Sequence, residues 1–147
     1  MQLDISQVAP RLFQGGRVDP ARSYRPFAMV VLCAVEHQPE LPRFAGTLLQ
    51  PAFDDTLTPQ PLDLQRAHAA AQQVVLTYRH NPTSNILITC WMGWNRSGLV
   101  TGLALNQLTT WSTAQIIHTI RQARGNQALS NLAFQQIIAR HNRHDRR

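Results

Sequence analysis

Short apolar runs alternate with longer amphipathic segments along this chain. Residues 27–35 (Phe-Ala-Met-Val-Val-Leu-Cys-Ala-Val) and 85–89 are apolar runs rich in branched side chains. They are too short for typical helices, and such runs are characteristic of buried parallel strands. Residues 8–13, which precede Gly15-Gly16, and residues 47–51 have the length and composition of two further short strands. The pattern therefore predicts strands at these four places.

Four longer segments have the spacing of helices. Residues 61–80 begin with a proline, which suits the first turn of a helix, and end before Asn81-Pro82, which stops one. Residues 97–108 follow as a second predicted helix. The apolar stripe of the first helix consists of Leu64, Ala67, Ala71, Val74, Val75 and Tyr78.

The last two predicted helices lie near the C-terminus. Ser112-Thr-Ala-Gln115 has the pattern of a capping box, and the helix it starts is expected to end near Gly125. A last helix begins at residue 129 or 130 and ends at 141. Its inward-facing side chains are predicted to be Leu132, Phe134, Ile137 and Ile138. Strands that alternate with helices indicate an α/β fold with a mainly parallel sheet flanked by helices.

Composition places limits on the class of protein. The chain has 147 residues, of which 44% are hydrophobic, as expected for a single folded domain. No apolar run approaches the roughly 20 residues of a membrane-spanning helix, and the N-terminus lacks the pattern of a signal peptide. Two cysteines without an export signal favour a reducing compartment, and we expect the protein to be cytoplasmic.

The charge of the chain favours anionic partners. The formal net charge is +6, and all 14 basic residues other than histidine are arginine. Four arginines and one aspartate give residues 140–147 a charge of +3. We therefore expect a domain over residues 1–139 and a basic tail over 140–147, which is either a nucleic-acid contact or a solvated end.

The strongest candidate chemistry follows the run at 85–89. Cys90 ends this run, Arg96 comes six positions later, and Ser97-Gly98 opens the helix over 97–108. A loop between a strand and a helix N-terminus can point successive backbone N–H groups at an anion. Gly93 gives such a loop the backbone freedom to close. Arg96 has a planar fork of donors that can bind two oxygens of a phosphoryl group.

The same electrostatic field can activate a nucleophile. Partial positive charge at a helix N-terminus stabilises a thiolate, so Cys90 is a candidate nucleophile. The alternative is a structural role, in which Cys90 packs at a strand end as a small hydrophobic side chain.

The Cys-x5-Arg-Ser pattern at 90–97 resembles the phosphate-binding loop of the cysteine-dependent protein tyrosine and dual-specificity phosphatases. Three other segments are similar to features of this superfamily in the same order: residues 10–16, the run at 27–35, and Asn131-Leu-Ala-Phe134. The resemblance implies a dual-specificity-phosphatase-like fold and a phosphatase that works through a phosphocysteine intermediate. It implies a phosphorylated substrate and no metal or cofactor.

The resemblance also assigns roles to individual residues. Cys90 would be the nucleophile, Asp55 the general acid with Asp54 as second choice, and Ser97 a donor that helps Cys90 leave the intermediate. Phosphate would be bound by Trp91, Met92, Gly93, Trp94, Asn95 and Arg96, through their backbone amides and the guanidinium of Arg96. Some members carry a second cysteine that forms a reversible disulfide with the nucleophile, and here Cys33 is the candidate.

Two features keep alternatives open. Most members of the superfamily have histidine directly before the cysteine, where this chain has Thr89, so a catalytically weak phosphate-binding protein remains an alternative. The pattern Gly-x-Asn-Arg-x-Gly at residues 93–98 also resembles the loop of members that remove phosphate from RNA 5′ ends. The substrate is therefore expected to be a phosphoprotein, with an RNA end as the alternative.

Overall fold

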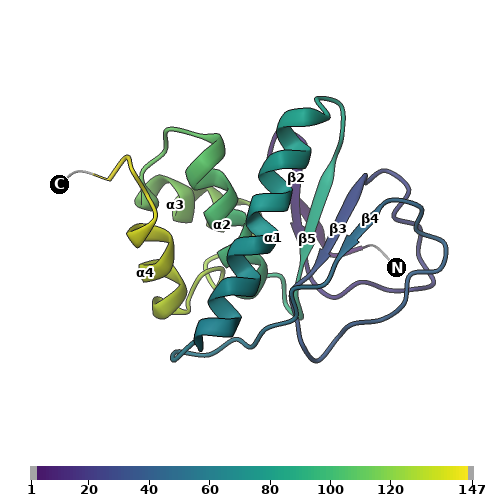
Figure 1. The fold of residues 1–147 in the computed structure, drawn as a ribbon, viewed down its shortest axis with the longest axis horizontal. Coiled ribbons are helices and arrows are strands. Elements are labelled where there is room, and N and C mark those ends of the chain that lie inside the picture. The colour runs from purple at the N-terminus through teal and green to yellow at the C-terminus, as the bar shows by residue number, and fades with distance from the viewer. Residues whose placement is uncertain (1–2, 146–147) are drawn as a thin grey trace.

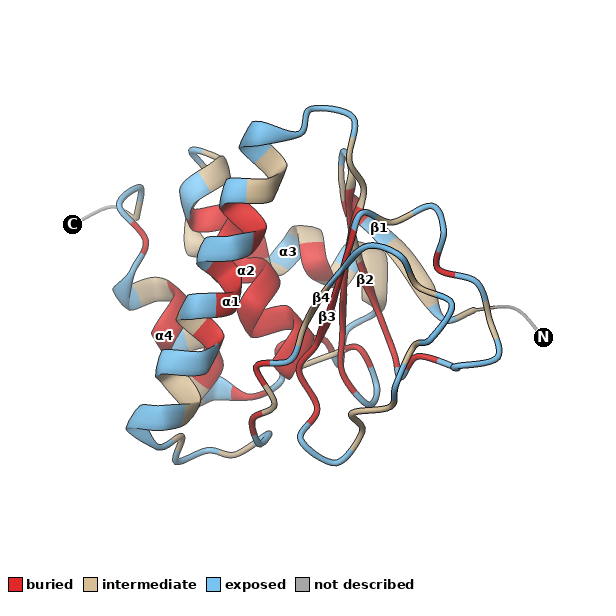
Figure 2. Cartoon of the chain, turned by 45° about the vertical axis from the view of Figure 1, so that its right-hand side comes forward, coloured by how far each residue is buried: buried red, intermediate tan, exposed pale blue. Residues whose placement is uncertain are grey.

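A five-stranded sheet packs against helices in the computed structural model of this chain, which describes residues 3–145 (Figure 1). The strands lie in the order β1-β2-β5-β3-β4. Their bounds are β1 Ile5–Ala9, β2 Leu12–Gly15, β3 Met29–Leu32, β4 Thr47–Leu49 and β5 Ile86–Thr89. The helices are α1 Pro61–His80, α2 Arg96–Leu108, α3 Thr113–Arg124 and α4 Leu132–Arg140. These helices all lie on the same side of the sheet (Figures 1 and 2).

The sheet is mainly parallel, as predicted. Strands β2, β5, β3 and β4 run in the same direction, and only β1 pairs antiparallel with its neighbour β2. Thr89 at the end of β5 is in register with Gly15 of β2 on one side and with Leu32 of β3 on the other. The carboxyl ends of three neighbouring strands therefore meet at one edge, where ligands of α/β sheets bind.

The prediction of one strand over residues 8–13 is wrong, because a tight turn divides this segment into the end of β1 and the start of β2. Pro10 cannot donate to a ladder, and Arg11 has a φ of 63°, which reverses the chain. The guanidinium of Arg11 donates to the carbonyls of Tyr78, Asn81 and Ser84, and these bonds hold the turn against the end of α1. The other three predicted strands are present in shorter form.

The predicted helices are confirmed with small shifts at their ends. Helix α1 has the predicted bounds, and the capping box of α3 is present, with Ser112 accepting a hydrogen bond from the backbone of Gln115. One inward-facing assignment is wrong, because Leu132 is 62% exposed. Leu132 is the first residue of α4 and lies outside the face of the helix that packs on the core. Phe134, Ile137 and Ile138 form that face and are buried.

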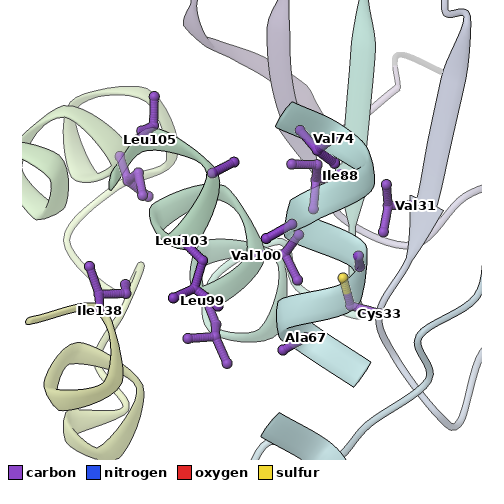
Figure 3. Close-up of a cluster of buried hydrophobic side chains, with 14 of the residues drawn as sticks. Val31, Cys33, Ala67, Val74, Ile88, Leu99, Val100, Leu103, Leu105 and Ile138 are labelled. Carbon is purple, nitrogen blue, oxygen red and sulfur yellow. The ribbon is translucent and has the colours of Figure 1, made fainter. Parts of the chain in front are cut away.

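The two faces of the sheet are covered in different ways. Val31 and Ile88 face the helices and pack with side chains of α1 and α2, such as Val74 and Val100 (Figure 3). Val30, Leu32 and Leu87 face the opposite side, where Val18 and Tyr24 from the segment between β2 and β3 cover them. Figure 2 shows that the buried residues concentrate in the central strands and in α2. The carboxyl edge of the sheet therefore rests on a closely packed core.

The segment after α4 contacts the domain as far as residue 145. Asn142 is buried and donates to Oδ1 of Asn106 at 2.7 Å. Asp145 accepts hydrogen bonds from the backbone and hydroxyl of Thr113 at the start of α3. A separate basic tail over 140–147 stays a prediction, and Arg146 and Arg147 lie outside the described residues. No helix within residues 3–145 has both the length and the apolar character needed to cross a membrane.

Candidate active site

Cys90 lies between the end of β5 and the start of α2, at the carboxyl edge of the sheet. Its backbone N–H donates to the carbonyl of Gly15 at 3.2 Å. Its sulfur lies 3.2 Å from the hydroxyl oxygen of Ser97, in the first turn of α2. The side chain of Cys90 is 4% exposed and forms no disulfide. A free thiol is thus held against a hydroxyl at the N-terminus of a thirteen-residue helix.

The carbonyl groups of the following loop all point away from its centre. Those of residues 91–94 each accept a hydrogen bond from a group outside the loop. The donors are, in order, Arg17 N at 3.1 Å, Arg124 Nη2 at 3.0 Å, Gln14 Nε2 at 2.9 Å and Leu129 N at 3.0 Å. In a planar trans peptide the N–H group points opposite to the carbonyl. The N–H groups of residues 92–95 therefore point into the loop, as an anion-binding nest requires.

Gly93 is the residue that lets the loop take this shape. Its φ is 72°, in the left-handed region that residues with a Cβ avoid. A Cβ at this position would also come within 2.6 Å of the backbone of Gly15. The prediction from sequence that Gly93 closes the loop is consistent with this backbone angle.

Arg124 clamps the outer side of the loop. It donates to the carbonyls of both Met92 and Gly93, and its guanidinium forms a two-pronged ion pair with Asp4, with both distances 2.9 Å. The sequence assigned no role to Arg124 or Gln14. Arg124 carries no local motif, and Gln14 was noted only as part of residues 10–16, far from the loop along the chain.

Arg96 is buried and is held by a carboxylate. Both of its terminal nitrogens donate to Glu36, with Nη2 2.6 Å from Oε2, and Nη1 also donates to the carbonyl of Phe53 at 3.3 Å. The Nε–H group is buried and has no hydrogen-bond partner among the described residues. The arginine therefore has a fixed orientation and a donor left to bind an oxyanion.

The pair of Arg96 and Glu36 is favoured in its charged form. The hydrogen bonds from Arg96 lower the pKa of Glu36, against the opposite effect of its partial burial. Burial acts against the charge of Arg96, but the hydrogen bonds to Glu36, together with the charges of Cys90, Glu36 and Asp55, more than offset it and raise the pKa of Arg96. Sequence reasoning missed Glu36. Its place directly after the apolar run at 27–35, at the carboxyl end of a predicted parallel strand, was the signal that could have identified it.

Asp55 is tied directly to the loop. Its Oδ2 accepts a hydrogen bond from Nδ2 of Asn95 at 3.0 Å, and its Oδ1 accepts one from Nδ2 of Asn131 at 2.8 Å. Asn131 also donates to the backbone of Thr56 and caps α4. Asp54 is exposed and forms no hydrogen bond or ion pair with any residue in the described part of the chain. Of the two aspartates, only Asp55 is held next to the loop.

Thr89 and Cys33 lie beneath the loop. The hydroxyl of Thr89 is buried and donates to the carbonyl of Val31 at 2.8 Å, so its hydrogen is already used within the sheet. Cys33 is fully buried and lies near Val31 and Ala67 (Figure 3), and its backbone N–H donates to the carbonyl of Thr89, the residue before Cys90. Burial, and then the charge of the neighbouring Cys90, raise the pKa of Cys33.

The same fold occurs in solved phosphatase structures. Human DUSP28 superposes with a TM-score of 0.80 at 18% sequence identity, covering 97% of this chain and 95% of that chain. Tk-PTP in its active form superposes with a TM-score of 0.77 at 17% identity, covering 95% of this chain and 96% of that one. The chain has the fold of a dual-specificity phosphatase.

A third similar structure belongs to a protein described as tyrosine phosphatase-like. The human tyrosine phosphatase-like serine/threonine/tyrosine-interacting protein superposes on this dual-specificity-phosphatase fold with a TM-score of 0.77 at 11% identity. The match covers 95% of each chain. No protein-family model and no curated protein sequence matches the chain. The likeness to these solved structures confirms the expected dual-specificity-phosphatase-like fold.

Proposed function

We propose that this protein is a cysteine-dependent phosphatase that hydrolyses phosphomonoesters, with a phosphorylated protein as its substrate. The observation that carries the proposal is the thiol of Cys90, 3.2 Å from the hydroxyl of Ser97, at the base of a loop whose carbonyls all point outward. This arrangement supports binding of a tetrahedral oxyanion directly above a nucleophile.

Binding of the phosphoryl group uses the loop and its arginine. The inward N–H groups of residues 92–95, the neighbouring amides of Trp91 and Arg96, and the free Nε–H of Arg96 would donate to the phosphoryl oxygens. Glu36 keeps the guanidinium in place before the substrate arrives. Because the donors are preorganised, little free energy is lost in ordering them when the phosphate binds.

The reaction then has two steps. In the first, the thiolate of Cys90 attacks phosphorus, so that a P–S bond forms and the P–O bond to the leaving group breaks. Asp55, in its protonated form, gives the leaving oxygen its proton. In the second step, Asp55 accepts a proton from a water molecule that attacks phosphorus. The P–S bond breaks, Ser97 donates a hydrogen bond to the departing thiolate, and inorganic phosphate is released.

Exposed apolar side chains around the site favour a protein substrate. Seven large hydrophobic residues are exposed in the described part of the chain, and five of them lie within two positions of a proposed site residue. These five are Val35, Leu57, Trp91, Met92 and Leu132. Exposed apolar side chains that flank site residues in the sequence favour a surface that binds another protein.

A pair of measurements tests the proposal. Wild-type protein is expected to hydrolyse 4-nitrophenyl phosphate, and Cys90→Ser to abolish this activity while it still binds vanadate or phosphate. Retained anion binding shows that the variant is folded. Hydrolysis that persists in Cys90→Ser would contradict the mechanism.

The position of Thr89 supports one alternative, a phosphate-binding protein without catalysis. Its hydroxyl donates to Val31 and carries no charge, so residue 89 does not help to keep Cys90 ionised. The rate of alkylation of Cys90 against pH separates the two functions. Reaction that sets in only above the ordinary thiol pKa of about 8.5 favours binding alone.

A substrate panel separates the substrate classes. Phosphotyrosine and phosphoserine peptides, set beside RNA with a 5′-triphosphate, distinguish the proposed phosphoprotein substrate from an RNA end. Faster release of phosphate from RNA would assign the chain to RNA ends instead.

Both cysteines are free thiols, which suits the reducing cytoplasm, the location that we propose.

Cys33 is included in the proposal as a redox partner. Hydrogen peroxide would oxidise the thiolate of Cys90 to a sulfenic acid, and the sulfur of Cys33 would attack it, forming a disulfide with loss of water. Non-reducing mass spectrometry of peroxide-treated protein tests this. A 33–90 disulfide is expected, and over-oxidised Cys90 beside an unmodified Cys33 would contradict it.

A further inference from the structure

A groove of about 550 Å³ adjoins the candidate active site. It lies between the loop after Cys90, the N-terminal segment and the turns that follow β2 and β3. Its lining includes Asp4, Arg17, Asp19, His37, Trp91 and Met92. Two of these residues, Trp91 and Met92, belong to the phosphate-binding loop itself. His37, another lining residue, directly follows Glu36, which binds Arg96. The groove therefore borders both the loop after Cys90 and the segment that holds Arg96.

Trp91 is fixed in the wall of this groove. The guanidinium carbon of Arg17 lies 4.4 Å from the centre of its ring, and the His37 ring meets it edge-on at 5.6 Å. Arg17 also donates to the carbonyl of Trp91 from its backbone and its side chain. The indole is nonetheless 39% exposed, and Met92 beside it is 42% exposed. Trp91 and Met92 therefore form an exposed apolar surface, in which the indole is held in place by Arg17 and His37 and is accessible to a ligand.

The charges in the groove are only partly compensated. Asp4 is paired with Arg124, and Asp19 forms an ion pair with Arg22 and accepts from the backbone of Ala21. Arg17 is exposed and forms no ion pair with a carboxylate within residues 3–145. Its contacts are the ring and carbonyl of Trp91. One guanidinium, stacked on an aromatic ring next to the phosphate-binding loop, is thus left to bind an anion.

We propose that this groove is a subsite for an acidic side chain close in sequence to the phosphorylated residue of a peptide substrate. The carboxylate would bind Arg17, and its methylene stem would pack on Trp91 and Met92. The inference rests on the proposed function and names the substrate feature that the site selects.

The mixed charge of the groove favours a peptide over a nucleic acid. Because Asp4 and Asp19 already pair with Arg124 and Arg22, the lining offers Arg17 as its one guanidinium without a carboxylate partner in the described part of the chain. One such group suits a single glutamate or aspartate better than a nucleic acid, which carries one negative charge per residue. The apolar part of the lining, which includes Val18 and Pro20, also suits peptide side chains better than a sugar-phosphate backbone.

The test compares matched peptides in a protein that cannot turn them over. Phosphotyrosine peptides carrying a single glutamate, or a single glutamine, at each of the three positions on either side are titrated against full-length Cys90→Ser. The same titrations are made with Arg17→Gln and with Arg25→Gln added. Arg25 is also exposed but does not line this groove, so its variant controls for the loss of one positive charge.

At one or more positions we expect the glutamate peptide to bind about fivefold more tightly than its glutamine counterpart, as for one exposed ion pair. The preference should vanish with Arg17→Gln and persist with Arg25→Gln. Equal binding at all positions, or a preference that survives Arg17→Gln, overturns the subsite. Binding of a 5′-phosphorylated oligonucleotide that depends on Arg17, without discrimination among peptides, overturns it in favour of nucleic acid.

Wild-type hydrolysis of 4-nitrophenyl phosphate is measured in parallel. Activity there without any preference among the peptides means that the subsite fails while the proposed function stands. A glutamate preference without any hydrolysis means that the subsite stands while the proposed function fails.

Discussion

Asn131 donates a hydrogen bond of 2.8 Å from its Nδ2 to Oδ1 of Asp55, although the two residues lie 76 positions apart in the sequence. The same side chain accepts from the backbone of Phe134 and so caps α4. One residue therefore links the start of the last helix to the proposed general acid. Asn95 donates to the other oxygen of Asp55, so the carboxylate is fixed from two sides.

Asn131→Ser separates the two roles of this residue. Serine also caps helices well but is too short to reach Asp55. We expect hydrolysis of phenyl phosphate, a poor leaving group, to fall about tenfold, a part of what general acid catalysis contributes. Hydrolysis of 4-nitrophenyl phosphate should fall less, with little change in the melting temperature. Equal losses on both esters, or a large loss of stability, would mean that Asn131 has only a structural role.

Asp55→Ala should show the same dependence on the leaving group more strongly. The expected loss is about a hundredfold on phenyl phosphate, because the leaving oxygen departs without a proton. The measurement is kcat for a series of aryl phosphates, plotted against the pKa of the leaving phenol. Asp54→Ala is the matched control and should leave the slope unchanged. A steeper slope in the Asp54 variant would reverse the assignment of the acid.

Glu36→Gln should weaken both the site and the fold. It leaves the buried guanidinium of Arg96 without a charged partner, so kcat/KM for 4-nitrophenyl phosphate is expected to fall about tenfold or more. Stability should fall by about 1–2 kcal/mol, less than for a fully buried pair because the side chain of Glu36 is 45% exposed. Glu40→Gln, an exposed change four positions along the same segment, is the control.

The pH dependence gives a second measure of the same pair. Arg96 lowers the pKa of Glu36 in the folded state, so its stabilisation is complete above the unfolded value of about 4.3. The stabilisation is lost as the pH falls through the lowered pKa. Glu36→Gln should therefore lose less stability than wild type on acidification through this window. Parallel unfolding curves for the two proteins would contradict the pairing.

His68 should make the fold sensitive to mild acid. Its ring lies 4.4 Å from that of His141, and burial, followed by the charge of His141, lowers its pKa. Below about pH 6.5 the unfolded chain binds a proton that folded His68 resists, so stability falls as the pH decreases. His68→Gln should reduce this slope in urea unfolding between about pH 8 and about pH 5. The exposed control His118→Gln should not, and a slope unchanged in both variants would exclude His68 as its cause.

The parts of the structure that could be predicted were those encoded locally. Pro61 and Asn81-Pro82 set the ends of α1, and Cys90, Arg96 and Ser97 lie close enough in sequence to form a recognisable loop. The phosphatase fold followed from the order of such segments.

The parts that could not be predicted depend on the register of distant segments. Glu36 reaches Arg96 because β3 and β5 are adjacent and end together, which no short pattern states. Arg124 and Gln14 hold the loop from a distant helix and strand for the same reason. The turn at residues 10–11 was missed because its reversing residue is Arg11, at a φ where the sequence would normally show glycine or asparagine.

The most direct test of the account is to trap the covalent intermediate. Wild-type protein is mixed with an aryl phosphate, quenched within one turnover and digested for mass spectrometry. The account predicts one phosphoryl group on the sulfur of Cys90, absent from Cys90→Ser. Turnover of the ester without any phosphate on Cys90 would contradict it.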